Sequence, residues 1–269
     1  MNLTTQQGKS SSILGLASYP ETDTDGAIVS AAFNSGINYF FFYNRCESFL
    51  DGLKPIIAAE REQVLVASGS QQRDILSLRQ CIEQLRNNLN IDGVDAFFVE
   101  YICPNDDMNQ VRMILDELRF WIEKGLIRYI GATTHNRSIA LELIQTEACD
   151  VLMHRYNMAH RKAEGDVLPC ALKAGIPVVA FTCTRWGSLL EAHPNWQHKP
   201  PTAADCYRYA LHNQAVSLAL TAPQSLQELA ENLCVLPVPS LAPTEIAHWR
   251  SYGDLIYGTG QDSFETKWE

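Results

Sequence analysis

The sequence predicts an α/β fold in which eight parallel strands, each followed by a helix, close into a (β/α)8 TIM barrel. Short runs of β-branched and aromatic residues alternate with longer segments of helical period, and eight such units fit into the 269 residues. The first expected strand leads into GLASYPETD, which lacks the glycine-rich phosphate fingerprint of an open, doubly wound sheet. The closed barrel is therefore favoured over the open sheet.

The strands are expected where several consecutive residues are mostly apolar and β-branched or aromatic, with polar or glycine-containing segments on either side. Each run is short enough for a strand and too short for a helix. In chain order the expected strands cover residues 12–18, 37–42, 64–68, 94–99, 127–132, 150–153, 176–181 and 216–220.

Helices are expected in the intervening segments, because apolar side chains recur there at steps of three and four residues. The segments 74–89, 108–125 and 224–233 show this period most clearly. Glycine and asparagine readily adopt the left-handed conformation that ends a helix. Helix ends are therefore expected at Gly36, Asn90, Gly125 and Gly175.

A single domain accounts for the whole chain, since no linker or low-complexity segment interrupts residues 1–269. The barrel is expected over about residues 12–235, with a helical tail over 236–269. The segment 241–258 is expected to form a final helix that packs on the barrel. In such barrels the chemistry occurs at the C-terminal ends of the strands, so the residues at those ends are the candidates for a site.

The overall charge limits the classes of partner. The formal net charge is -10 and the isoelectric point is near 5.2, which argues against nucleic acids and anionic membranes. No apolar run of about 18 residues is present, so no transmembrane helix is expected. The N-terminal residues 1–12 are polar and lack an apolar signal core, which predicts a cytoplasmic protein. A small-molecule substrate is the expected partner, and the oligomeric state is left open.

The eight cysteines do not form a metal-binding pattern. None belongs to a CxxC pair, so neither a zinc nor an iron–sulfur site is predicted. Scattered thiols of this kind are expected to be buried small side chains in a reducing compartment. Cys46 precedes an expected helix and is a weak candidate nucleophile, although an inert buried thiol is favoured.

Several segments resemble the aldo/keto reductase superfamily over most of residues 12–235. The resemblance implies a TIM barrel and NAD(P)H-dependent carbonyl reduction. In that family a tyrosine protonates the carbonyl oxygen, a lysine and an aspartate tune the tyrosine, and a histidine orients the substrate. The resembling segments are GINYFF (36–41), IDGVDAFFVEY (91–101), GLIRYIGATTHN (125–136), residues 155–190 and AVSLALTAPQSLQELAENL (215–233).

All four catalytic positions that the resemblance implies carry other residues. The aspartate corresponds to Phe41, the tyrosine to Cys46, the lysine to Gly69 and the histidine to Glu100. The resemblance therefore implies the barrel of a reductase without its usual catalytic set. Either new chemistry or loss of activity is expected.

The cofactor positions that the resemblance implies are also altered. Thr133 and Thr134 replace the serine–asparagine pair that holds the nicotinamide carboxamide, and Phe181 replaces the ring that stacks on it. No lysine or arginine lies between residues 209 and 249 to bind phosphate. Binding of NAD(P)H is therefore doubtful, and the cofactor is left unknown.

One feature still favours a phosphate near the eighth strand. Ser225 and Glu228 have the spacing of a capping box, which places a helix N-terminus at the loop that binds the cofactor in the resembling family. Ser225 is therefore retained with Thr133, Thr134 and Phe181 as a candidate cofactor-binding residue.

Glu100 is the main catalytic candidate. Among Phe41, Phe42 and Tyr101 its carboxyl would be poorly solvated, and its pKa is expected to rise towards neutrality. Such a group can act as general acid or base. The alternative is a structural glutamate paired with a nearby arginine. Tyr43 has the same strand parity as Phe41 and is a candidate displaced acid, while Phe41 and Tyr101 are expected to contact substrate.

Two polar loops follow the fifth and sixth strands, at residues 134–137 and 154–161. His135 lies just past a strand end and is the third catalytic candidate. An anionic or polyhydroxylated substrate is expected here, because arginine makes forked contacts to carboxylate or phosphate. The alternative is a salt-bridged cluster in which Arg161 pairs with Glu164. The expected substrate-binding residues of these loops are His154, Arg155 and Asn157.

A metal is not predicted, although Glu100, His135 and His154 lie at neighbouring strand ends. Metal-dependent barrel hydrolases usually carry an H-x-H pair after the first strand, and none is present. After the seventh strand, Arg185 and Trp186 are expected either to bind an anionic ring or to pack as a cation–π pair. The proline-rich segment 192–202 is long enough to act as a lid.

Three functions are consistent with these residues. The first is a barrel enzyme acting on a small polar or anionic molecule by acid/base chemistry with Glu100 and His135. The second is an NAD(P)H-dependent oxidoreductase with a rebuilt proton donor, Glu100 or Tyr43. The third is a catalytically inactive binding or regulatory homologue. The loss of the catalytic set disfavours the second, and the dense polar rim disfavours the third.

Overall fold

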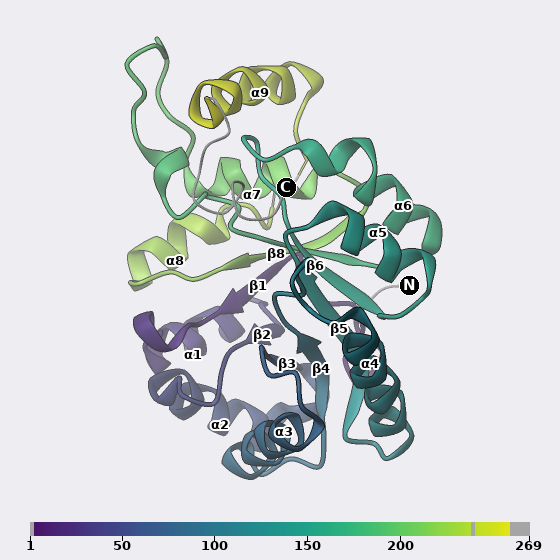
Figure 1. Cartoon of the computed structure of the whole chain (residues 1–269). Coiled ribbons are helices and arrows are strands. Elements are labelled where there is room, and N and C mark those ends of the chain that lie inside the picture. The colour runs from purple at the N-terminus through teal and green to yellow at the C-terminus, as the bar shows by residue number, and fades with distance from the viewer. Residues whose placement is uncertain (1–2, 238–239, 259–269) are drawn as a thin grey trace.

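The computed structural model describes residues 3–237 and 240–258 and shows the predicted closed barrel (Figure 1). Its eight strands are all parallel and follow chain order around the ring, with β8 pairing back to β1. The fold class predicted from the sequence is confirmed. The strands are β1 (Leu14–Ala17), β2 (Tyr39–Phe41), β3 (Leu65–Ser70), β4 (Val94–Val99), β5 (Ile127–Thr134), β6 (Val151–Arg155), β7 (Val178–Phe181) and β8 (Val216–Thr221).

The predicted helix ends are also confirmed. Asn90 and Gly175 close their helices in the left-handed conformation, and Gly36 and Gly125 adopt positive φ just beyond theirs. The helices are α1 (Gly26–Asn34), α2 (Glu47–Glu60), α3 (Ile75–Leu89), α4 (Met108–Glu123), α5 (Arg137–Gln145), α6 (Val167–Ala174), α7 (Ala203–Leu211), α8 (Leu226–Leu233) and α9 (Pro243–Tyr257), with 3-10 turns η1 (Pro20–Thr22), η2 (Arg61–Gln63), η3 (Lys162–Gly165) and η4 (Ser188–Leu190).

The core consists of two apolar layers. The larger lies between the strands and the ring of helices, and the smaller fills the inside of the barrel. In the inner layer, Phe41 of β2 meets Phe98 of β4 edge to face, with ring centroids 5.7 Å apart. The barrel interior is therefore packed with side chains, and the ends of the strands are the place where a barrel of this kind holds a ligand.

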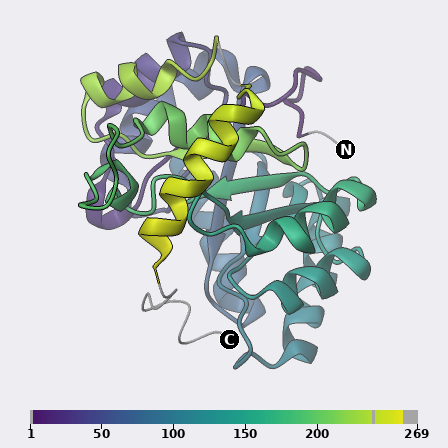
Figure 2. The same cartoon turned by 90° about the horizontal axis from the view of Figure 1, so that it is seen from above.

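Helix α9 forms the predicted final helix and lies against α7 and the connections after β6 and β7 (Figure 2). Arg250 of α9 bonds Glu164 at 2.6 Å, and the Tyr252 hydroxyl donates to the carbonyl of Glu191 at 2.5 Å. Gly253 packs directly on the backbone of Met158. The tail residues 238–239 and 259–269 lie outside the described residues. Among the described residues, no helix is long and apolar enough to cross a bilayer.

Candidate active site

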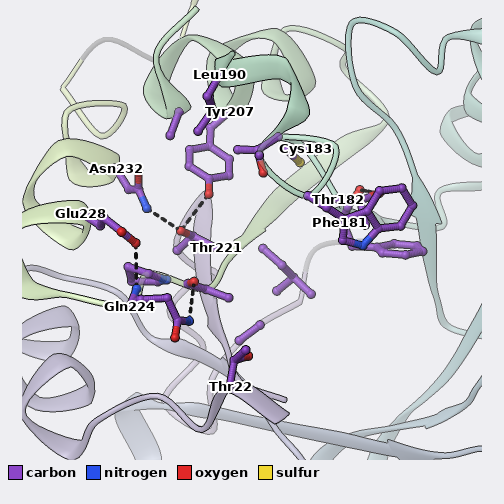
Figure 3. Close-up of a pocket in the computed structure, with 18 of the residues that line it drawn as sticks. Thr22, Phe181, Thr182, Cys183, Leu190, Tyr207, Thr221, Gln224, Glu228 and Asn232 are labelled. Carbon is purple, nitrogen blue, oxygen red and sulfur yellow. Dashed lines mark hydrogen bonds between the residues drawn. The ribbon is translucent and has the colours of Figure 1, made fainter. Parts of the chain in front are cut away.

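A cavity of about 1090 Å³ opens at the C-terminal ends of β7, β8 and β1 (Figure 3). Ala17, Phe181 and Thr221 end these strands and form part of its wall. The segment 199–203, which comprises the end of the predicted lid and the first residue of α7, closes another side. The volume is at the upper end of the range of small-molecule sites, roughly 300–1,000 Å³.

One wall of the cavity is a row of three aromatic side chains from different strand ends. The His135 ring lies between Tyr101, at a centroid distance of 5.7 Å, and Phe181, at 5.2 Å. Tyr101 has a positive φ of 51°, and its N–H donates to Thr133 Oγ1 at 2.8 Å. Thr133 therefore holds the backbone that aims Tyr101 at the cavity, and it is not itself part of the wall.

The loop after β7 has a strained backbone and supplies a second wall. Thr182, Arg185 and Trp186 all have positive φ near 50°, a region that costs energy for residues with a side chain. Asn157 donates to the Thr182 carbonyl at 2.9 Å, and Arg185 donates to the Ile256 carbonyl at 3.3 Å. Trp186 lines the cavity, whereas Asn157 and Arg185 hold the loop and lie outside the wall.

At the end of β8, one hydroxyl joins three elements. Thr221 Oγ1 accepts hydrogen bonds from the Tyr207 hydroxyl of α7 and from Asn232 Nδ2 of α8, both at 2.9 Å (Figure 3). Thr221 and Asn232 are almost fully buried, and all three side chains line the cavity. This cluster ties α7 and α8 to the end of the strand between them.

The start of α8 differs from the predicted capping box. Ser225 Oγ accepts from the Glu228 N–H at 3.1 Å, as expected. The Glu228 carboxylate instead accepts from the N–H of Gln224 at 2.8 Å, one residue before the cap. The box is thus formed on one side only, because the loop presents the Gln224 amide to the carboxylate. Ser225 caps the helix and is not in the cavity wall.

The charged groups of the wall are mainly acidic. Among the described residues that line the cavity, Lys199 is the only lysine or arginine, and the carboxylates are Glu21, Glu228 and Glu231. Phosphates are usually held by backbone N–H groups and by lysine or arginine. These residues therefore do not fit the phosphates of the nicotinamide dinucleotide that the resemblance implies.

Glu100 lies at the end of β4, next to the cavity but outside its wall. Its side chain is almost completely buried, Oε1 accepts from the Tyr43 hydroxyl at 2.9 Å, and buried Oε2 has no hydrogen-bond partner among the described residues. Burial raises the pKa of Glu100 to about 7, against the lowering effects of the Tyr43 hydrogen bond and the Arg73 charge.

The alternative of a Glu100–Arg73 ion pair does not describe this carboxyl. Arg73 donates to the backbone carbonyl of Glu100 at 2.7 Å, while its charge is paired with Asp106 at 3.0 Å. The Glu100 carboxyl therefore receives a hydrogen bond from Tyr43 and none from a cation in the described chain.

Gly69 makes the room that the Glu100 side chain occupies. A Cβ atom at position 69 would lie 2.8 Å from both Cγ and Cδ of Glu100, closer than real Cβ contacts. The resemblance noted above implies that the family lysine and histidine fall at positions 69 and 100. Whatever that correspondence, the glycine at 69 and the glutamate at 100 are sterically linked.

Two phenols connect Glu100 with the cavity. Tyr19 and Tyr101 both line the wall, and the Tyr19 ring lies 5.6 Å from that of Tyr43. Burial raises the pKa of Tyr101, and the charge of Glu100 raises it further. Burial raises the pKa of Tyr19, and the neighbouring Tyr101 and Glu100 raise it further. Phe41 packs edge to face against Tyr43 at 5.5 Å and is excluded from the cavity.

The remaining candidates from β5 and β6 brace the strand ends. His154 is buried, and its Nδ1 must donate to the Thr134 carbonyl, 2.8 Å away, because a carbonyl only accepts. Burial lowers the pKa of His154 to about 4. Thr134 Oγ1 donates to the Ile102 carbonyl at 2.6 Å. His154, Thr134 and the half-buried Arg155 are not part of the cavity wall.

Two further expectations for the rim have clear outcomes. The alternative of an Arg161–Glu164 pair is not observed: Arg161 pairs with Asp254 and Glu164 with Arg250, because α9 places both partners there. Cys46 is fully buried, and burial raises its pKa, as expected for an inert thiol.

Several wall residues were not identified from the sequence. Tyr19 follows the end of β1, so it could have been identified from the sequence as a side chain at the C-terminal end of a strand. Tyr207, Glu231 and Asn232 lie on helices α7 and α8, and Lys199 lies in the segment before α7. No strand-end pattern marks these positions, and only the closed barrel brings them to the site.

Comparisons with known proteins agree with this fold. The Aldo/keto reductase family model matches residues 15–203, well over half of the chain. An aldo-keto reductase of Bacillus halodurans in its holo form superposes with a TM-score of 0.76 at 16% identity, covering 93% of this chain and 95% of that one. An aldo/keto reductase of Klebsiella pneumoniae in complex with NADP and acetate gives 0.75 at 16% identity, with coverages of 94% and 95%. The chain therefore belongs to the aldo/keto reductase family.

Proposed function

We propose that the protein is an atypical enzyme of the aldo/keto reductase fold that acts on a small polar molecule by acid/base chemistry with Glu100. The observation that carries the proposal is the Glu100 carboxyl at the end of β4. It is buried, it has a pKa near 7, and one oxygen is held by Tyr43 while the other has no hydrogen-bond partner in the described chain. Buried carboxyls of this kind serve as general acids or bases.

The chemistry follows from the protonation states near neutral pH. With a pKa of about 7, Glu100 populates both its acid and its base form, so it can give or take a proton with little energetic cost. Burial raises the pKa of Tyr43, so its hydroxyl stays protonated and continues to donate to Oε1. The free Oε2 is then the atom that exchanges a proton. Tyr19 and Tyr101 line the cavity and Glu100 does not, so the proton passes between Glu100 and the substrate through one of these hydroxyls, while His135 in the wall orients the substrate.

The substrate is proposed to be polar and not anionic. The expectation of an anion rested on histidine and arginine loops that the barrel uses for bracing, such as His154 and Arg161. Three carboxylates and one lysine form the charged part of the cavity wall. An anionic substrate would meet repulsion there.

The alternative is an NAD(P)H-dependent reductase with a rebuilt proton donor. Phe181 in the wall and the volume of the cavity favour it, and the Klebsiella pneumoniae relative is described as a complex with NADP. The wall does not fit the phosphates, and Thr133 and Thr134 bind backbone atoms outside the cavity. We therefore place this function second. An inactive homologue is disfavoured, because a buried glutamate with a raised pKa destabilises a fold that has no use for it.

The proposal predicts that Glu100→Gln abolishes proton exchange without loss of fold. A pool of hydroxyketones and aldoses is incubated with the protein in D2O, and exchange of carbon-bound hydrogen is followed by proton NMR. We expect exchange with the natural sequence and a loss of about 100-fold or more in Glu100→Gln, the size of a general acid/base contribution. Glu83→Gln, an exposed glutamate of α3, is the control and should not change the rate.

The pH profile separates a catalytic from a structural role. Exchange should show an inflection near pH 7, and Tyr43→Phe should move it to higher pH, because the Tyr43 hydrogen bond lowers the Glu100 pKa. An unchanged rate in Glu100→Gln would refute the proposal. Quenching of tryptophan fluorescence by micromolar NADH or NADPH would instead support the reductase.

A further inference from the structure

We propose that the cavity takes an organic ligand without negative charge, and that Glu228 is the side chain that excludes phosphate groups. The inference concerns binding in the cavity and is independent of the chemistry proposed for Glu100. It rests on the hydrogen bonds at the start of α8, on the charges of the wall and on the Thr221 hydroxyl.

At the start of α8, two N–H groups that could bind an external anion are taken by the side chains of Ser225 and Glu228. A helix N-terminus normally offers free N–H groups to a phosphate. Here Ser225 Oγ takes the N–H of Glu228, and Glu228 Oε2 takes the N–H of Gln224 at 2.8 Å. A carboxylate thus lies where a phosphate oxygen would bind, and an incoming phosphate would have to displace it and remain beside it.

The neighbouring charges strengthen this exclusion. Glu21 and Glu231 add two carboxylates to the described wall, and Lys199 offers one cation against them. Like charges repel one another, and the repulsion is stronger near a protein surface than in bulk water. A dinucleotide carries at least two negative charges on its phosphates, and the carboxylates of the wall would repel these charges.

The rest of the wall indicates what does bind. Tyr101, His135 and Phe181 form an aromatic row, and Trp186 is 59% exposed in the wall, so a flat or apolar body can lie against them. Thr221 is only 1% exposed, and its oxygen already accepts two hydrogen bonds. No described residue accepts the Thr221 proton, so it is available for a carbonyl or hydroxyl oxygen of the ligand.

The first test is gain of phosphate binding. NADH and inorganic pyrophosphate are titrated by calorimetry into the natural protein, into Glu228→Ala and into the control Glu231→Ala, whose carboxylate bonds the side chain of Gln227 at 3.1 Å. We expect no binding by the natural protein up to about 1 mM, a gain of about tenfold or more in Glu228→Ala, and a clearly smaller gain in Glu231→Ala. Glu228→Gln keeps the shape and removes the charge, which guards against a folding defect.

Tight NADH binding by the natural protein would overturn the inference. An equal gain in Glu231→Ala would overturn the assignment to Glu228, because it would show a general charge effect.

The second test compares ligands of one shape and different charge. Benzylamine, benzyl alcohol and benzoate are examined by saturation-transfer NMR, with Thr221→Val as the variant that loses the free donor. We expect signals from the ammonium and the alcohol, none from benzoate, and a weaker alcohol signal in Thr221→Val. Preferential binding of benzoate would contradict the proposal, whatever the outcome for Glu100.

Discussion

Glu100 keeps its position because position 69 carries no side chain. The backbone of β3 runs directly beneath the Glu100 carboxyl, and any Cβ there would contact Cγ and Cδ at 2.8 Å. Glycine in a strand interior normally lowers stability and often marks close approach of another group. Here that group is a side chain with a raised pKa, so the local loss of stability is linked to the formation of the candidate site.

Gly69→Ala adds one methyl group and therefore tests whether the missing side chain at position 69 is what allows Glu100 to take its buried position. The added carbon would also lie 2.9 Å from the Phe98 carbonyl, so Glu100 must rotate and the site must strain. We expect a loss of about 1–3 kcal/mol in the free energy of unfolding, typical of overpacking, and loss of the inflection near pH 7. Urea denaturation and the exchange profile measure the two effects. Gly165→Ala, with no atom within 4 Å of its Cβ, should be nearly neutral, and equal losses in both variants would refute the steric link.

At the scale of elements, strands and helices were predictable because each is encoded by its own residues. The expected strand 94–99 matches β4, and Asn90, which ends the preceding helix, has the left-handed φ of 53°. These signals are local, since a strand buried on both faces, as β4 is, reads as a short apolar run, and helix caps act on adjacent residues. The raised pKa of Glu100 was predictable for a similar reason, because a strand-end carboxyl among aromatic rings is poorly solvated.

The cavity wall was harder to predict because it is assembled from distant segments. The strand-end rule found Tyr101 and His135, and the resemblance indicated Phe181; these three side chains form one wall. The strand-end rule also selected His154, which points into backbone contacts, because strand position alone does not set the direction of a side chain. Asn232 comes from helix α8, and its role depends on the Thr221 hydroxyl that the closed barrel brings to it.

Helix α9 is the element that connects the tail to the cavity. Gly253 lies against the Met158 carbonyl, and Tyr252 packs on Trp196 with ring centroids 5.2 Å apart. Trp196 belongs to the segment that leads to Lys199 and the cavity wall. The position of α9 therefore determines the position of one side of the cavity.

Gly253→Ala should displace α9 from the barrel. The new methyl group would overlap the backbone of Met158, which cannot rotate away as a side chain does. We expect a loss of more than about 2 kcal/mol in stability together with increased solvent exposure of Trp196 and Trp249, seen as a red-shifted emission. Ser251→Ala, at an exposed position of the same helix, should change neither quantity. Emission that stays unchanged in Gly253→Ala would show that α9 tolerates the contact and does not set the cavity wall.

At the scale of the whole molecule, folding shifts the pKa values of two buried groups in opposite directions. Burial raises the pKa of Glu100 from 4.5 to about 7 and lowers that of His154 from 6.5 to about 4. Between about pH 4.5 and 6.5, the unfolded chain binds the His154 proton and has lost the Glu100 proton. The folded protein holds the Glu100 proton and leaves His154 neutral. Both states therefore bind the same number of protons at these two sites, and their contributions to the pH dependence of stability cancel.

Removing either group should reveal the pH dependence of the free energy of unfolding that the other group contributes. In Glu100→Gln only the unfolded chain binds the remaining proton, so the free energy of unfolding should rise with pH, by about 3 kcal/mol between pH 4 and 6.5. In His154→Gln only the folded protein binds the proton, so stability should fall by a similar amount as the pH rises from 4.5 to 7. Urea denaturation at half-unit pH steps measures all three curves, and the slopes do not depend on any constant loss caused by the substitutions. Parallel curves for the three proteins would show that neither side chain is buried in the protonation state inferred here, and would remove the physical basis for Glu100 as a proton-transfer group.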